Sequence, residues 1–324
     1  MYRSSVRNLF IISLVFNSLM LPRAVSAQQG TLQLLTLPAG SMAYGVGVTL
    51  AATITRNSPY TTIIAGYGGA QVIVPMLESG RAELALINAN DAAHGFRGEL
   101  PFHKANNNLR LISNAYANTV GIIVARDSDI KSISDIRGKR VTGAFSSHKS
   151  CEQLAEAQMA NMGLTRDDVK IVPVSSPVAS VEALSEGRAD VALCATPGMP
   201  AILEAGTKIG IRYISLDPSA AAVQNMKAVF TAGAIALEPK GAIPDLTEDT
   251  YFLEYDYYLV GSTHLADTAV KQILTVLWDQ HENLVKENRE FSSWSPARMA
   301  LPGSTIPYHP AAIEFFKSKG ITLP

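Results

Sequence analysis

The sequence predicts an α/β protein built from two similar lobes. Short apolar, strand-like runs alternate with helical stretches along almost the whole chain, which is typical of this fold class. In addition, one phrase occurs twice, as SGRAELALIN at residues 79–88 and as EGRADVALCA at residues 186–195. The 107 positions from Gly80 to Gly187 exceed the roughly 20–50 residues of a solenoid repeat, so the repetition favours two lobes.

Length and charge narrow the possible functions. The chain has 324 residues, of which 47% are hydrophobic, enough for one large domain or two ordinary ones. Its net charge is −1, and no stripe of lysine and arginine stands out. Because a nucleic-acid backbone is held by a basic field, we expect no nucleic-acid partner.

The N-terminal stretch, residues 1–27, has the pattern of a secretory signal. Two arginines precede the apolar run LFIISLVFNSLML at residues 9–21, and Val25-Ser26-Ala27 places small residues before a cleavage site. The alternative is an uncleaved membrane anchor, but the run is shorter than the roughly 20 apolar residues that a spanning helix needs. We therefore expect cleavage after about Ala27 and an exported, soluble mature protein.

The elements of the first lobe alternate between apolar strands and helices that begin after small-residue turns. Gly80 is expected to end one of these helices, because a helix C-terminus often needs a residue with positive φ. The expected strands are 31–37, 61–65 and 83–87, the expected helices are 44–56, 71–78 and a short one after 88–91, and the apolar runs 109–113 and 120–125 lead out of the lobe.

The second lobe repeats this alternation, and the C-terminal part returns to the first. Apolar residues of the segment 267–288 recur at helical spacing, which predicts one long amphipathic helix. These boundaries assign residues 28–122 and 232–324 to lobe I and residues 123–231 to lobe II. The expected elements are 130–136, strand 138–141, helix 151–162, strand 170–174, helix 178–185, strand 190–193, strand 251–261, helix 267–288 and helix 310–319.

Five turns between a strand and a helix are candidate ligand contacts. Ligands of α/β proteins bind at the carboxyl ends of strands, where free helix N–H groups favour anions. At one turn, Lys149 could pair with a carboxylate and His148 could donate a hydrogen bond, or both could simply be solvated at a helix start. Ser150 with Gln153 also fits a capping box. The five turns are 40–42, 68–70, 88–91, 146–150 and 195–197.

No catalytic constellation is recognisable. The sequence contains no nucleophile elbow, no P-loop, no H-E-x-x-H and no G-x-G-x-x-G, and its six histidines are dispersed. We therefore predict a binding protein and not an enzyme, with no metal and no cofactor. An enzyme on the same scaffold is the alternative, because a fold does not fix a function.

Two stretches carry a resemblance to a known family. Residues 130–150, IKSISDIRGKRVTGAFSSHKS, resemble the pattern I-K-S-V-x-D-L-K-G-K-R-V followed by a small-residue turn, and residues 306–321, IPYHPAAIEFFKSKGI, resemble the ending I-P-x-H-P-G-A-x-x-Y-Y-x-E-x-G. Both patterns are those of TAXI-type substrate-binding proteins, the solute receptors of one class of TRAP transporters. The resemblance covers essentially the whole mature chain.

This resemblance implies a periplasmic-binding-protein fold of type II, in which each lobe is a mixed, mostly parallel sheet flanked by helices and the ligand cleft lies between the lobes. It implies a monomeric periplasmic receptor that closes around a small carboxylate, such as a glutamate-like, 2-oxoacid or dicarboxylate ligand. The partner is then an integral-membrane TRAP transporter. A receptor that feeds a membrane sensor is the alternative.

The resemblance also implies a set of ligand-binding positions, with three departures from the family pattern. Met42 replaces a small residue in PAGSMAYG, the turn FSSHKS is one residue longer than P-G-S-G-T, and Cys194 stands where glycine is common. We therefore expect the ligand to differ from the usual one. The positions carried over are Ser41, Met42, Tyr44, Gly68, Gly69, Asn90, Asp91, Ser146, Ser147 and Thr196, to which the turn analysis adds His148 and Lys149.

The chain has two cysteines, Cys151 and Cys194. On the type II fold, Cys151 begins a helix of the second lobe and Cys194 ends a strand on the same side of that lobe. Export to an oxidising compartment makes a disulfide between them possible. The sequence leaves both states open, a disulfide or two free thiols.

Overall fold

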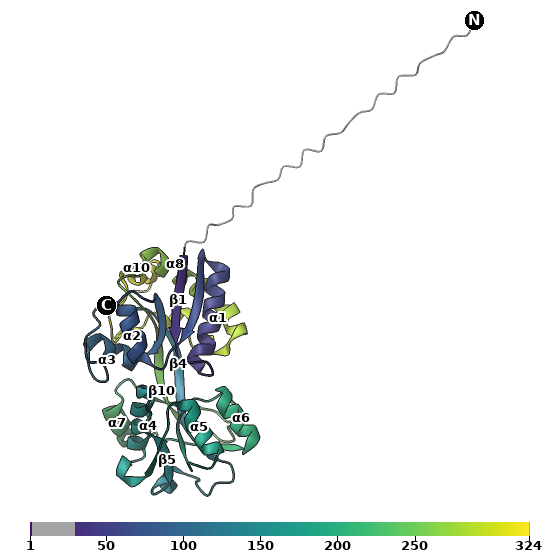
Figure 1. Ribbon diagram of the computed structural model, residues 1–324, viewed down its shortest axis with the longest axis vertical. Coiled ribbons are helices and arrows are strands. Elements are labelled where there is room, and N and C mark those ends of the chain that lie inside the picture. The colour runs from purple at the N-terminus through teal and green to yellow at the C-terminus, as the bar shows by residue number, and fades with distance from the viewer. Residues whose placement is uncertain (2–29, 324) are drawn as a thin grey trace.

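The computed structural model describes Met1 and residues 30–323, so the expected signal sequence lies outside the described residues. Two lobes are stacked end to end and are joined by two long strands, β4 (Leu109–Ala125) and β10 (Thr250–Ser262), which run from one lobe into the other (Figure 1). These strands pair antiparallel along their length. The α/β fold class that the sequence predicts is confirmed.

Lobe I is built on a five-stranded part of the main sheet, in the order β2-β1-β3-β10-β4. The strands β1, β2 and β3 are parallel, and β10 is antiparallel to β3 because it returns from the other lobe. The elements are β1 (Gly30–Thr36), α1 (Met42–Asn57), β2 (Tyr60–Gly66), α2 (Ala70–Glu78), β3 (Leu84–Asn88), α3 (Ala89–Arg97), α8 (Asp267–Asp279), α9 (His281–Glu287) and α10 (Pro310–Ser318).

Lobe II is built around the second half of β4. The strands β7 and β8 both pair antiparallel with that half, and β5 pairs parallel with β6. The elements are β5 (Arg140–Gly143), α4 (Lys149–Asn161), β6 (Lys170–Pro173), α5 (Pro177–Ser185), β7 (Ala192–Ala195), α6 (Pro200–Lys208), β8 (Ile211–Ile214), α7 (Ala220–Val229) and β9 (Ala234–Glu238).

The repeated phrase marks the same local structure in both lobes. Helix α2 ends before Gly80, at φ 68°, and helix α5 ends before Gly187, at φ 70°. Both are in the left-handed region that glycine adopts without a steric cost. The prediction that Gly80 ends a helix is confirmed, and Gly187 has the same role in lobe II.

The runs 109–113 and 120–125 belong to one strand, β4, which leads out of lobe I as predicted. Two parts of the sequence analysis need correction. The predicted helix 267–288 is broken into α8 and α9 at Gln280, next to His281, whose Nε2 lies 3.0 Å from the Phe291 carbonyl oxygen. The sequence pattern also does not indicate α6, β8, α7 and β9, because these are short elements and α7 buries only Ala222 and Met226.

The position of β9 indicates where lobe II ends in the sequence. It pairs with residues 250–254 of β10, and Ile243 and Leu246, which follow it, belong to an apolar cluster with residues of β7 and β8. We propose that lobe II extends to about residue 250, instead of ending at residue 231.

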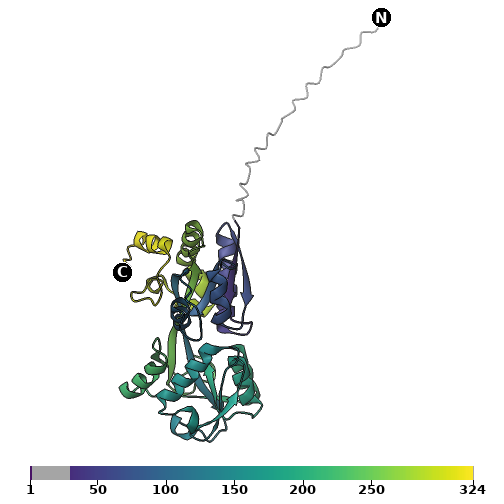
Figure 2. The same ribbon diagram turned by 60° about the vertical axis from the view of Figure 1, so that its left-hand side comes forward.

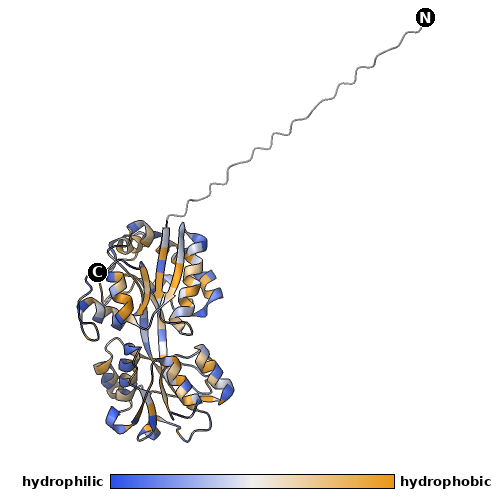
Figure 3. Ribbon diagram, in the orientation of Figure 1, coloured by the Kyte–Doolittle hydropathy of each residue, from blue (hydrophilic) through white to orange (hydrophobic). Residues whose placement is uncertain are grey.

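Most buried apolar side chains form one cluster that extends through both lobes, and a smaller cluster lies among β7, β8, α5 and α6 of lobe II. The strands are largely hydrophobic, and the helices that cover them carry hydrophilic residues (Figure 3). In lobe I, α10 lies beside α8 in both views, with the Phe315 ring edge-on to Trp278 at 6.0 Å (Figures 1 and 2). Burying each large apolar side chain contributes roughly 1.5–3 kcal/mol to the free energy of unfolding. This packing fixes the helices on the sheet, and with them the helix N-termini that face the cleft. Within residues 30–323, no helix is both long and apolar enough to cross a membrane.

Candidate functional site

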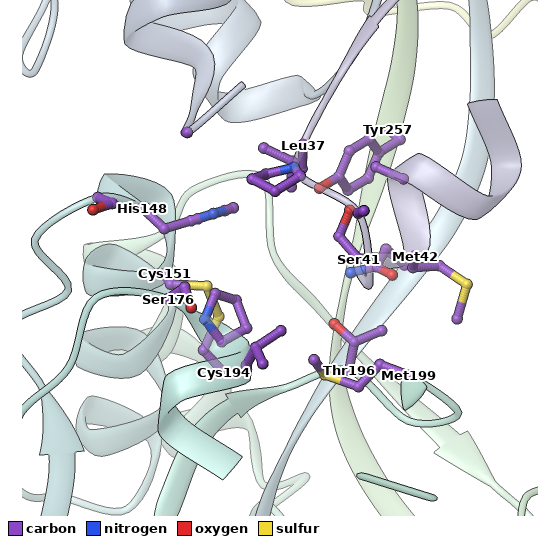
Figure 4. A pocket seen from close by; sticks show the side chains of 18 of the residues that line it. Leu37, Ser41, Met42, His148, Cys151, Ser176, Cys194, Thr196, Met199 and Tyr257 are labelled. Atoms are coloured by element: carbon purple, nitrogen blue, oxygen red, sulfur yellow. A yellow bond between two sulfur atoms is a disulfide. The ribbon is translucent and has the colours of Figure 1, made fainter. Parts of the chain in front are cut away.

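A cavity of about 250 Å³ lies between the lobes, where helices of both lobes begin (Figure 4). Lobe I contributes its strand-to-helix turns after β1 and β2, and lobe II contributes the turns before α4, α5 and α6. The two connecting strands form the remaining wall. The lining residues are Leu37, Pro38, Ala39, Ser41, Met42, Ala43, Gly68, Asn118, Ser147, His148, Cys151, Ser176, Pro177, Val178, Cys194, Thr196, Met199, Tyr255 and Tyr257.

Four helices direct their N-termini at this cavity. Their N-cap residues are Ser41 for α1, His148 for α4, Ser176 for α5 and Met199 for α6, and all four line the cavity. The first N–H groups of a helix have no partner within the helix, and they carry the positive end of its dipole. One helix belongs to lobe I and three belong to lobe II, so an acceptor group bound here can contact both lobes.

Three hydroxyl groups add further donors. The Oγ atoms of Ser41 and Ser176 each accept a hydrogen bond from the backbone N–H three residues ahead, at 3.2 Å. The Tyr255 hydroxyl oxygen accepts from Asn118 Nδ2 at 2.7 Å. Because each oxygen already accepts a bond from the protein, its own O–H proton remains to donate to a ligand.

The ionisable groups of the cavity wall are neutral at neutral pH. Burial raises the pKa of Tyr255 and of Tyr257 well above the usual value for a phenol. Burial also lowers the pKa of His148 to about 4, so its imidazole is uncharged. Among the described residues that line the cavity, none is Asp, Glu, Lys or Arg. The cavity therefore offers dipoles and hydrogen-bond donors but no charged side chain.

The rest of the wall is apolar and rich in sulfur. Met42 and Met199 approach from the side of α1 and α6, and a disulfide between Cys151 and Cys194 closes the side of lobe II (Figure 4). The disulfide ties the start of α4 to the end of β7. Of the two states that the sequence leaves open, the structure contains the disulfide.

The residues singled out by the sequence fall into two groups. Those that line the cavity are Ser41, Met42, Gly68, Ser147, His148 and Thr196. Those that lie outside its lining are Tyr44, Gly69, Asn90, Asp91, Ser146 and Lys149. Lys149 is the first residue of α4, and its side chain is exposed, although the residue before it faces the cavity.

Several residues of the second group join the lobes. Asn90 Nδ2 of α3 donates to Gln153 Oε1 of α4 at 3.0 Å. The neighbouring Asp91 is buried and hydrogen-bonded to the Ser150 side chain of α4. A Cβ atom on Gly69, at φ 157°, would lie 3.4 Å from the Ser147 carbonyl oxygen. The two hydrogen bonds connect α3 of lobe I to α4 of lobe II, and the absence of a side chain at Gly69 lets the backbones of the two lobes approach.

We expect Asn90→Ala to weaken ligand binding about threefold to tenfold, because the closed arrangement loses one hydrogen bond worth about 0.5–1.5 kcal/mol. Titration calorimetry with any bound ligand measures this change. Asn283→Ala is the matched control, since it removes an amide–amide bond to Gln280 of similar length (2.9 Å) on the outer helix α9. Equal affinities for the two variants would contradict a role of Asn90 in lobe closure.

The sequence analysis missed most of the apolar lining and four polar cavity residues: Asn118, Ser176, Tyr255 and Tyr257. A signal existed for each of the four. Asn118 lies between the two apolar runs 109–113 and 120–125 of β4, and the tyrosines belong to the aromatic run at residues 251–258. Ser176 followed by proline is a helix-start pattern. Their meeting depends on the pairing of β10 with β4, which residue spacing alone does not reveal.

The fold and the cavity define the class: two α/β lobes joined by two strands, with a cavity between them, form the fold of periplasmic solute-binding proteins. Solved structures share it. A periplasmic transporter protein aligns with a TM-score of 0.56 at 12% identity, over 81% of this chain and 87% of that chain. A TctC solute-binding protein from Polaromonas aligns with a TM-score of 0.50 at 12% identity, over 82% of this chain and 87% of that chain.

An ancestral arginine-binding protein, solved with arginine bound, has a TM-score of 0.50 at 15% identity, over 82% of this chain and 99% of that chain. At such identities the likeness is one of fold. The model of the NMT1-like family matches residues 34–320, which is most of the chain. The chain therefore belongs to the NMT1-like family.

Proposed function

We propose that this protein is an exported receptor that captures a small organic anion between its lobes and delivers it to a membrane transporter of the TRAP type. The observation that carries the proposal is the convergence of helix N-termini and hydroxyl donors from both lobes on one cavity. A ligand that contacts both lobes stabilises the closed arrangement over the open one, which is how hinged receptors signal occupancy.

The donors favour an anionic ligand. A carboxylate accepts about four hydrogen bonds, and bonds to a charged acceptor are about twice as strong as neutral ones. A cationic ligand would instead need carboxylates, and the described residues lining the cavity include none. The absence of a recognisable catalytic set in the sequence supports a binding role over an enzymatic one.

The export and the TRAP partner rest on the sequence. The signal-like pattern of residues 1–27 supports export to the periplasm, and the TAXI-type motifs at 130–150 and 306–321 support the transporter class. Co-purification of the exported protein with the integral-membrane protein encoded beside it tests the partner. Recovery of a membrane sensor in place of a transporter would contradict this part of the proposal.

We expect Ser41→Ala to weaken anion binding about tenfold to a hundredfold, because one hydroxyl donor to a charged group is worth about 1.5–3 kcal/mol. Ser41 also caps α1, so its loss costs the helix about 1 kcal/mol. Ser219→Ala separates the two effects, because Ser219 caps α7 in the same way and does not line the cavity.

Calorimetry and thermal unfolding of both variants give the comparison. The proposal predicts similar losses of stability for the two, with a loss of affinity for Ser41→Ala alone. Unchanged affinity of the Ser41 variant for an anion that the wild type binds would contradict the assignment.

A further inference from the structure

We infer that the ligand carries a single negative charge on an otherwise apolar body, as in a branched or aromatic monocarboxylate. The inference rests on the proposed function and narrows it, because the resemblance alone also implies dicarboxylates and amino acids. The supporting observation is that one cavity combines hydrogen-bond donors for a carboxylate with described lining residues that include no charged side chain.

The described lining residues offer no charged side chain to a second ionised group of the ligand. Burying an ion without a compensating charge or full hydrogen bonding is very unfavourable. The donors described above belong to the helix starts and to Ser41, Ser176 and Tyr255, and they suffice for one carboxylate. The ammonium of an amino acid needs acceptors with negative charge, and the described residues of the lining contain no Asp or Glu.

A second cavity, next to the first, would repel a second carboxylate of the ligand. A cavity of about 350 Å³ adjoins the first and shares Met42, Asn118 and Thr196 with it. Its wall carries three carboxylates and one arginine, and the arginine is already paired with one of them. A ligand arm that reached from the first cavity into the second would therefore meet net negative charge. These residues are Glu238, Glu254, Glu290 and Arg289.

The apolar wall fits an apolar body. Flexible or branched hydrocarbon lines the cavity at Leu37, Met42, Val178 and Met199, and the Cys151–Cys194 disulfide is part of the same lining. Each ligand methylene buried against such a wall tightens binding roughly fourfold. A polar chain gains nothing from these contacts, whereas an isopropyl or phenyl group gains from all of them.

Two matched pairs of compounds test the inference by calorimetry on the purified protein. 5-Methyl-2-oxohexanoate is 2-oxoglutarate with an isopropyl group in place of the second carboxylate. 4-Methyl-2-oxopentanoate is leucine with an oxo group in place of the ammonium. We expect the monoanion of each pair to bind at least tenfold more tightly than its partner.

The outcomes separate the inference from the proposed function. If 2-oxoglutarate or leucine binds as tightly as its monoanionic counterpart, the inference is overturned and the receptor function stands. If none of the four compounds binds, the inference is overturned, and a wider screen of organic anions decides whether the receptor function stands. Tighter binding of both monoanions supports both.

One substitution tests the same charge argument in the opposite direction, by adding a positive charge to the cavity wall. Val178 lies in the cavity wall near the start of α5 and is partly exposed, so a longer side chain is tolerated there. Val178→Lys is expected to shift the preference toward 2-oxoglutarate by at least tenfold relative to wild type, because it supplies the missing positive charge. Val178→Met is the uncharged control of similar length and is expected to keep the preference for the monoanion. The same shift in both variants would overturn the charge argument.

Discussion

Reduction of the Cys151–Cys194 disulfide is expected to lower the free energy of unfolding by about 2–4 kcal/mol and to weaken ligand binding. The bridge closes a loop with a sequence separation of 43, and opening such a loop restores conformational freedom to the unfolded chain. The binding loss follows from the position of the bridge, because both cysteines line the cavity and tie the start of α4 to the end of β7.

Thermal and denaturant unfolding with and without reductant measure the effect. The chain has only these two cysteines, so reductant has no other target, and a Cys151→Ser/Cys194→Ser variant should not respond to it. Unchanged stability after thiol titration has shown two free thiols would contradict the prediction.

The backbone at Cys194 provides a second comparison. Its φ is 55°, in the left-handed region where glycine is unstrained. A Cys151→Ser/Cys194→Gly variant should therefore be more stable than the double-serine variant, by up to about 1 kcal/mol.

The second large effect concerns Asp91. Burial raises its pKa from 3.8 to about 6. The unfolded chain therefore releases this proton first, and the native state loses stability as the pH rises from about 4 to about 6. Above pH 6 the loss is complete and amounts to about 3 kcal/mol, given about 1.4 kcal/mol for each pKa unit. Asp91→Asn cannot ionise, so it should unfold at higher denaturant concentration than wild type at pH 7.5 and not at pH 4.

His148 has the opposite trend in the same range. Its pKa is lowered from 6.5 to about 4 by burial, so protonation of the unfolded chain destabilises the native state as the pH falls below about 6.5. The two trends partly cancel in the wild type, so the difference between wild type and Asp91→Asn is the quantity to follow from pH 4 to pH 8. A difference that does not change with pH would contradict an ionised, buried Asp91.

Local patterns are sufficient to predict the fold class and some of the residues that line the candidate site. The alternation of strands and helices, together with small residues at the turns, is enough to assign Ser41, Gly68, Ser147 and Thr196 to strand-to-helix turns. This works because a turn at a helix start has a short, specific sequence pattern and because the carboxyl ends of parallel strands share one edge of a sheet.

The lack of charged side chains among the described lining residues could not be predicted from which residues are adjacent in the sequence. Lys149 directly follows His148, yet the helix turns the two side chains in different directions, and only His148 faces the cavity. Tyr255 and Tyr257 reach the cavity from β10, whose pairing with β4 joins residues more than a hundred positions apart. Such long-range pairing depends on the packing of the whole lobe and not on residue spacing.

The most direct test of the receptor account is a thermal-shift screen of the purified protein against small organic anions, repeated on a variant with a filled cavity. A ligand at a hundred times its dissociation constant adds about 2.7 kcal/mol to the free energy of unfolding. The account predicts a clear shift for at least one apolar monocarboxylate, lost in Val178→Trp and kept in Leu203→Trp, whose side chain is exposed on α6. A shift that survives Val178→Trp, or no shift with any anion, would contradict it.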